Sequence, residues 1–180
     1  MESIVIFVLL MVLFIVWITS VRRSLVIMNE HINHAMNQIG VQISARFDAL
    51  AALLDIAKSY AEDESAALIS EIQARRSVIT AKSKPDDVIR QEELIYEMLG
   101  KIVRMAQHCP ALKEDEDYVS CMDAIDCYEG MIFTSRLIYN DSVTKYNRVI
   151  LLFPNSLAVK VLGFHKRDNL ESFEDGQRRI

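Results

Sequence analysis

The chain opens with an unbroken run of apolar residues. From Ser3 to Val21 it carries no charge, and Arg22 and Arg23 follow at once. A helix that rises about 1.5 Å per residue covers about 28 Å over this run, close to the hydrocarbon thickness of a bilayer at about 30 Å. The pattern predicts a membrane-spanning helix, so residues 1–23 are assigned as a transmembrane anchor.

A cleaved signal peptide and a buried core helix are the alternatives for this run. A signal peptide has basic residues before its apolar run and small residues after it, whereas Glu2 precedes this run and Trp17 to Val21 end it. A core helix of a soluble protein is rarely apolar on every face over such a length. An uncleaved anchor fits the residues better than either alternative.

Apolar residues then recur at steps of three and four, which is the helical period. The first stripe runs from Ile32 to Ala61, and no proline separates it from the anchor. We therefore expect the anchor and the first bundle helix to form one rod that ends near Tyr60. A second helix is expected to start in the acidic cluster at residues 62–65, with apolar positions as far as Ile79.

Two further helices follow from the same pattern. Ser83, Lys84 and Pro85 predict the cap and first turn of a third helix that ends at His108, before Pro110. A short polar loop should come next. A fourth helix is expected to run from Met122 to Phe153, because its steps of three and four form an unbroken heptad seam.

Pro154 ends the fourth helix, and Asn155 or Ser156 can cap a last short helix that stops at Gly163. This pattern predicts an all-α fold, in which the transmembrane helix continues into an antiparallel four-helix bundle over residues 24–164. Residues 165–180 are charged and are predicted to be a polar flexible tail. The short helix either covers the end of the bundle or lays its apolar face on lipid or on another subunit.

Composition narrows the function classes. The 180 residues include only five glycines and three prolines, which favours helices. The net charge of −5 is spread along the chain, without a basic run longer than a pair, so a nucleic-acid partner has little support. Cys109, Cys121 and Cys127 lack the paired C-x2-C spacing of metal sites, and we expect no metal and no cofactor.

The orientation follows from the charges beside the anchor. Arg22 and Arg23 flank its C-terminal end, and only the α-amino group is positive on the other side. Positive flanks favour the cytoplasm, so the N-terminus is predicted outside the cell membrane and the bundle inside. An odd number of cysteines without a disulfide framework agrees with a reducing compartment.

Two charged residues interrupt the seam of the fourth helix. Glu129 and Arg136 lie one heptad apart, where unpaired charges in a dry core would be costly. We hypothesise that they form a buried network with Asp48 of the first helix, which fixes the register of the two helices. The alternative is that the stripe rotates along the helix and both charges reach solvent.

Several motifs of the chain occur together in one known family. They are Tyr139-Asn140-Asp141-Ser142-Val143-Thr144-Lys145-Tyr146-Asn147, Phe153-Pro154, Gly163-Phe164, the spaced residues Glu129, Ile132 and Arg136, the turn Pro110-Ala111-Leu112-Lys113, and the first-helix segment Gln42 to Tyr60. Together with the N-terminal anchor, this composite pattern resembles the LemA family. The resemblance covers nearly the whole chain up to about Phe164.

The resemblance implies a membrane-anchored helical bundle of bacteria that is not known as an enzyme. Some members occur beside membrane-protease systems or in organelle-biogenesis sets. The chain departs from the family pattern at residues 45–52, where an Ile-Pro-Asn step is replaced, and at Cys109, where an aromatic residue is usual. If the missing proline kinks the first helix in relatives, that kink should be weaker or absent here.

The sequence shows no nucleophile beside a base, no phosphate-binding glycine loop and no H-E-x-x-H helix. Our first hypothesis is a single-pass inner-membrane protein that acts without catalysis, as a scaffold or accessory factor for envelope or membrane proteins. Those proteins, or a second copy of this chain, are then its partners. A sensor or receptor subunit is the alternative, and an enzyme that uses scattered carboxylates is the third.

Overall fold

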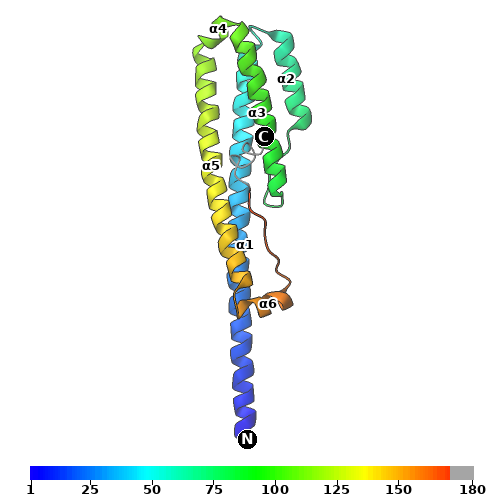
Figure 1. The fold of residues 1–180 in the computed structure, drawn as a ribbon, viewed down its shortest axis with the longest axis vertical. Helices are drawn as coiled ribbons and strands as arrows, with labels where there is room; N and C mark the ends of the chain where they lie inside the picture. Colours follow the sequence, from blue (N-terminus) through cyan, green and yellow to red (C-terminus); the bar gives the residue numbers. More distant parts are fainter. Residues whose placement is uncertain (171–180) are drawn as a thin grey trace.

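The structure, a computed structural model, describes residues 1–170. Their regular structure is entirely helical. The helices are α1 (Glu2–Ala57), α2 (Glu62–Arg75), α3 (Pro85–His108), α4 (Pro110–Lys113), α5 (Glu116–Leu151) and α6 (Asn155–Leu162). Figure 1 shows that α1 runs the full height of the molecule, with the other helices gathered around the part that lies beyond its apolar start.

The 56 residues of α1 form one continuous helix about 84 Å long. Val21 and Leu25 are the first residues of α1 that are buried in the bundle. The apolar residues before them, from Ile4 to Val16, are exposed. Among the described residues, α1 is the one helix long and apolar enough to cross a membrane. The prediction that a long apolar helix continues into the bundle is confirmed.

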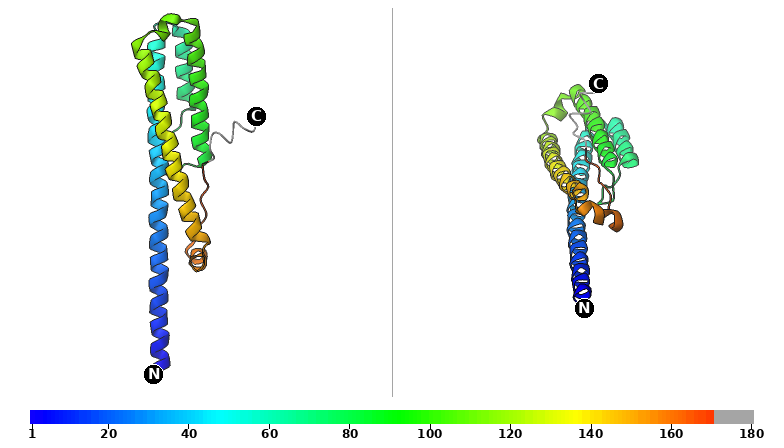
Figure 2. Two further views of the ribbon diagram at one scale, coloured as in Figure 1. Left: turned by 60° about the vertical axis from the view of Figure 1, so that its left-hand side comes forward. Right: turned by 60° about the horizontal axis from the view of Figure 1, so that its bottom comes forward.

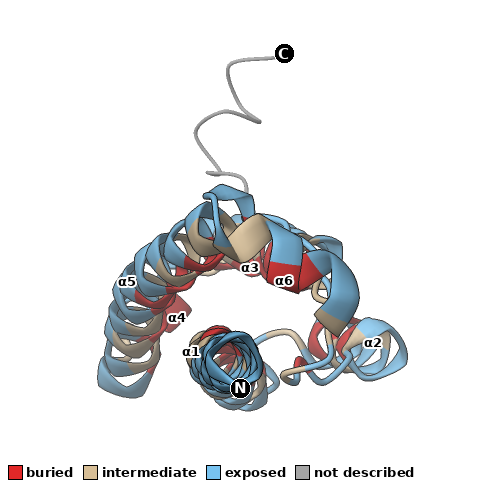
Figure 3. Cartoon of the chain, turned by 90° about the horizontal axis from the view of Figure 1, so that it is seen from below, coloured by how far each residue is buried: buried red, intermediate tan, exposed pale blue. Residues whose placement is uncertain are grey.

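The bundle is built on the pair of α1 and α5, which pack most extensively and run antiparallel. Helices α3 and α2 complete it at the end far from the N-terminus, and α5, α3 and α2 form an arc around α1 that leaves one side of it open in the view from below (Figures 2 and 3). The predicted apolar stripe of α1 lies in the core, where Ile39, Ile43, Phe47, Leu50 and Leu54 are buried.

Several helix ends differ from the sequence prediction, and α1 and α5 stop slightly early, at Ala57 and Leu151. Helix α2 stops at Arg75, well before Ile79. The expected polar loop contains the short helix α4, and α5 begins at Glu116 because Asp115 caps it by accepting hydrogen bonds from two backbone N–H groups. Ser83 does not cap α3; its hydroxyl accepts a hydrogen bond from the Thr80 N–H.

Residues 165–170, the first part of the predicted tail, run along α5, and Arg167 and Leu170 form hydrogen bonds with its side chains. Gly163 ends α6 in the left-handed conformation, with φ of 73°, and the chain then runs extended beside the bundle. The rest of the predicted tail lies outside the described residues.

Candidate functional site

A cluster of charged side chains joins α1, α3 and α5 within the bundle. Arg46 of α1 is fully buried, and its Nη2 lies 2.7 Å from Oε2 of Glu129 on α5. Tyr96 of α3 donates its hydroxyl to Oε1 of Glu129. The Arg46 guanidinium also lies over the Tyr96 ring, 4.8 Å from its centroid, a cation–π contact. Glu129 thus receives one partner from each of the other two helices.

A second ion pair lies in the same cluster. Nη1 of Arg136 on α5 lies 2.5 Å from Oε2 of Glu92 on α3, and both residues are buried. Burial raises the pKa of the Glu92 carboxyl, and the charge of Arg136 opposes that rise. Burial, followed by the hydrogen bond to Glu129, also raises the pKa of Tyr96. Because each charge has a partner on another helix, the cluster can specify how the three helices align.

The hypothesis that Asp48 belongs to this network is wrong. Oδ1 of Asp48 lies 2.8 Å from Nη1 of Arg76, at the surface. Asp48 is two residues from Arg46 and so points about 200° away from it around the helix. Glu129 is also less enclosed than the hypothesis required, with 44% of its side chain exposed, whereas Arg136 is 8% exposed.

Arg46 was missed from the sequence, although a signal was present. It lies three residues after Ile43 and four before Leu50, on the same helix face as the apolar stripe. Glu92 of α3 was also missed, although it lies four residues after Val88 and three before Ile95, on the buried face of that helix. Tyr96 follows Ile95 and lies beside that face. A charged residue at helical spacing from apolar core positions was the feature of the sequence that could have predicted this cluster.

A second polar arrangement holds residues 164–170, which we call the C-terminal strap. The Asn147 side chain donates to the Arg167 carbonyl at 2.8 Å and accepts from the Arg167 N–H at 3.0 Å. Asn140 does the same with Leu170, at 2.9 and 2.8 Å. The Tyr139 hydroxyl donates to the Asp168 carbonyl at 3.0 Å.

The spacing of the two asparagines fits an extended strap. Seven residues of helix advance about 10.5 Å, and three residues of extended chain advance about 10 Å. Asn140 and Asn147 therefore meet Leu170 and Arg167 in register, and each amide satisfies both backbone groups of its partner. The remaining signature residues lie elsewhere: Tyr146 is buried, Asp141 pairs with Lys145, and Phe153 and Pro154 are exposed between α5 and α6.

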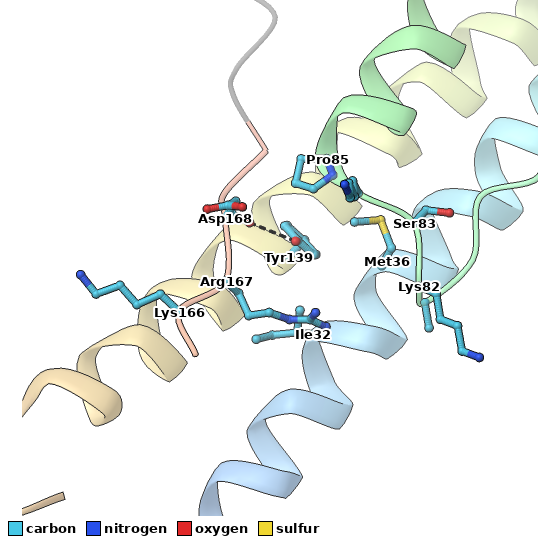
Figure 4. Close-up of a pocket in the computed structure, with 11 residues that line it drawn as sticks. Ile32, Met36, Lys82, Ser83, Pro85, Tyr139, Lys166, Arg167 and Asp168 are labelled. Atoms are coloured by element: carbon cyan, nitrogen blue, oxygen red, sulfur yellow. Dashed lines mark hydrogen bonds between the residues drawn. The ribbon is translucent and has the colours of Figure 1, made fainter. Parts of the chain in front are cut away.

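A cavity of about 290 Å³ lies between the strap, α1 and the start of α3. Its walls combine apolar and polar side chains, among them Ile32, Met36, Ser83 and Tyr139. Figure 4 shows Tyr139 bonded to Asp168 across one side, while Lys82 and Lys166 extend away from the cavity. Its volume lies just below the range for small-molecule sites, about 300–1,000 Å³.

The outer face of α5 carries exposed apolar side chains midway along the helix. We call Met131, Phe133, Leu137 and Ile138 the α5 midsection; all four are exposed. Ile132, Ser135 and Arg136 lie between them and face the core, so the exposed apolar side chains flank the buried face of α5 on both sides.

Comparison with protein families gives one finding for this chain. The family model described as LemA family matches residues 35–180, which includes the charged cluster, the α5 midsection and the strap. A search of curated proteins finds no match.

Proposed function

The chain belongs to the LemA family, and we propose that it acts without catalysis, as a membrane-anchored scaffold or accessory factor for other membrane or envelope proteins. The apolar start of α1 holds the bundle at the bilayer, and this raises the effective concentration of the bundle for partners in the same membrane. The bundle then offers a fixed surface to those partners.

The α5 midsection is the observation that carries this proposal. Phe133 and Leu137 lie one turn apart and present large apolar side chains to solvent, with Met131 and Ile138 on the other flank. Exposed apolar surface of this kind marks contact sites for other proteins. The helix beneath is held in place by the charged cluster through Glu129 and Arg136, so the surface is rigid before a partner arrives.

Crosslinking in intact cells tests this proposal. A photoreactive residue at Phe133 should trap the same partner in repeated experiments. The same residue at Val78 is the matched control, because Val78 is 79% exposed but lies in the loop between α2 and α3. Recovery of no reproducible partner from Phe133, or of the same products from both sites, would count against a scaffold.

Loss-of-contact variants sharpen the result. Phe133→Ser with Leu137→Ser should abolish the crosslink from Met131 while leaving thermal unfolding nearly unchanged, since both side chains are exposed. Capture of a second copy of the chain would identify the partner as a homo-oligomer, and capture of a different membrane protein would identify a client.

We also propose that the bundle lies in the cytoplasm. Arg22 and Arg23 directly follow the apolar run, and this supports the orientation. Cys127 is exposed and reports on it. A membrane-impermeant thiol reagent should leave Cys127 unlabelled in intact spheroplasts and label it after lysis, whereas labelling of intact spheroplasts would reverse the orientation.

The cavity between the strap, α1 and the start of α3 supports a second candidate function, that of a sensor for a small molecule. A small molecule bound beside Tyr139 and Ser83 would contact the strap, α1 and the start of α3 at once, so binding could shift their packing. A screen for compounds that raise the unfolding temperature tests this idea, with Met36→Trp as the variant that fills the cavity. Stabilisation that persists in Met36→Trp would place the ligand elsewhere.

A further inference from the structure

A second group of exposed apolar residues lies at the opposite end of α5 from its cap. We call this group the foot; it consists of Leu151, Leu152, Phe153, Leu157 and Val161, all exposed. It lies on the last turn of α5, on the connection to α6 and on α6 itself. Neither the bundle core nor the charged cluster uses these side chains.

The register of α1 and α5 gives the height of the foot. Arg46 contacts Glu129, and one pocket is lined by both Met28 and Lys145. Since antiparallel helices rise equally per residue, Leu151 lies level with about residue 23 of α1. The apolar run of α1 ends at Val21, so the foot begins at the height where α1 leaves the predicted hydrocarbon region.

The orientation of α6 fits a surface that is parallel to the bilayer. Figures 1 and 2 show α6 lying across the long axis of the molecule, and Figure 3 shows it crossing the lower end of the bundle. Ala158 and Val159 are buried against the bundle, whereas Leu157 and Val161, one turn apart, stay exposed. An anchor along the membrane normal would place α6 in the membrane plane.

Positive charges accompany the foot. The exposed basic residues at this level are Arg22, Arg23, Arg148 and Lys160. Basic side chains beside an apolar face are typical of helices that lie in the interface of a membrane with anionic lipids. This charge pattern and the continuity with the span favour lipid as the occupant over a second copy or another protein.

We propose that the foot inserts into the interfacial region of the bilayer that α1 spans, so that the protein contacts the membrane at two points. The inference rests on the anchoring included in the proposed function. A single span leaves a bundle free to rotate and tilt. The foot restricts both motions, and it therefore fixes the direction in which the exposed side of α5 points within the plane of the membrane.

Fluorescence quenching by spin-labelled lipids tests the foot in the full-length protein. The three native cysteines are replaced by serine, and an environment-sensitive dye is attached to Val161→Cys in vesicles of phosphatidylcholine with a minority of phosphatidylglycerol. Val78→Cys is the matched control, since Val161 is 82% and Val78 79% exposed. Ile79, next to Val78, packs against Gly40, about 27 Å along α1 from residue 22. Val12→Cys reports on the span itself.

Lipid labelled near the headgroup should quench the dye at Val161 several-fold more than the dye at Val78, and deeply labelled lipid should quench the dye at Val12. Quenching at Val12 but not at Val161 would overturn the foot and leave the anchor intact. A blue-shifted dye at Val161 that lipid does not quench would show that protein covers this face, and would also overturn it. No quenching at Val12 would overturn the anchor, and the foot with it.

Discussion

Arg136 of α5 is a buried arginine, 8% exposed. It lies in the core with its guanidinium against Glu92, and the pKa of that carboxyl is raised by burial. Arg136→Met leaves Glu92 buried without this cation. We expect a loss of about 3–5 kcal/mol in the free energy of unfolding, the usual cost of removing one partner of a buried pair. Chemical denaturation in detergent micelles measures it.

The double variant separates charge pairing from packing. Arg136→Met with Glu92→Met replaces both ions by apolar side chains of similar length, and such replacements are often neutral or stabilising. We expect it to be more stable than Arg136→Met alone. A double variant that is less stable than both single variants would show that the two side chains stabilise the protein through contacts other than their pairing, contrary to this account.

Gly40 is a position where backbone contact decides the residue type. A Cβ atom added there would lie 2.3 Å from the carbonyl oxygen of Ile79, in the connection that passes over α1. Gly40→Ala gains about 1 kcal/mol of helix propensity but forces two backbones apart, at a typical cost of about 1–3 kcal/mol. We expect net destabilisation and a lower unfolding temperature.

Two other helical glycines are controls for Gly40. A Cβ atom at Gly100 in α3 or Gly130 in α5 meets nothing within 4 Å. Gly100→Ala and Gly130→Ala should therefore stabilise the protein by about 0.5–1 kcal/mol. If Gly40→Ala stabilised the protein to the same degree, the close approach of Ile79 would not affect the free energy of unfolding, and this account of Gly40 would be wrong.

The sequence pattern predicted that Glu129 and Arg136 need partners inside the bundle. It did not predict which residues those partners are. The heptad seam placed Glu129 and Arg136 toward the bundle correctly, because position along one helix depends on local spacing. The choice of Arg46 over Asp48 depends on the rotation of α1 against α5, which only the packed pair sets. Partner identity is thus a property of tertiary packing.

At the scale of elements, helices were predictable where their ends carry local signals. Pro85 and Pro110 correctly bracketed α3, and Gly163 correctly ended α6. The start of α5 was placed too late because the seam begins at Met122, while the capping residue Asp115 lies outside the seam. The strap looked flexible for a similar reason, since its order comes from α5 side chains distant in sequence.

The strap is an element whose order depends on two side chains. Asn147→Leu removes the acceptor of the Arg167 N–H and the donor to the Arg167 carbonyl. At about 1 kcal/mol per hydrogen bond, we expect the Arg167 amide to exchange with solvent at least roughly fivefold faster. Residue-resolved hydrogen exchange measures this rate.

Thr144→Leu is the matched control for Asn147→Leu, because Thr144 is an exposed residue of α5 between the two asparagines. Exchange at Arg167 should stay unchanged in that variant. Asn140→Leu should instead speed exchange at Leu170, whose N–H it accepts. Unchanged exchange at both amides in the two asparagine variants would show that burial, rather than the asparagines, orders the strap.

At the scale of the whole molecule, the anchor and the bundle share one helix. No proline occurs in α1, and the first proline of the chain is Pro85. The absent Ile-Pro-Asn step of the family pattern removes the strongest local cause of a kink. Any tilt of the span in the bilayer must therefore move the charged cluster and the α5 midsection with it, as parts of one body.

Distance measurement between spin labels tests this rigidity in lipid nanodiscs. Val8→Cys and Val41→Cys are both exposed, one in the apolar run and one in the bundle, and 33 residues of straight helix separate them by about 50 Å. We expect one narrow distance distribution near that value. Adding Val26→Pro, which removes a helical hydrogen bond between the two labels, should shorten and broaden it. A distribution that is already broad without the proline would mean that the span and the bundle are hinged, and a foot beside a hinged span could not fix the orientation of α5.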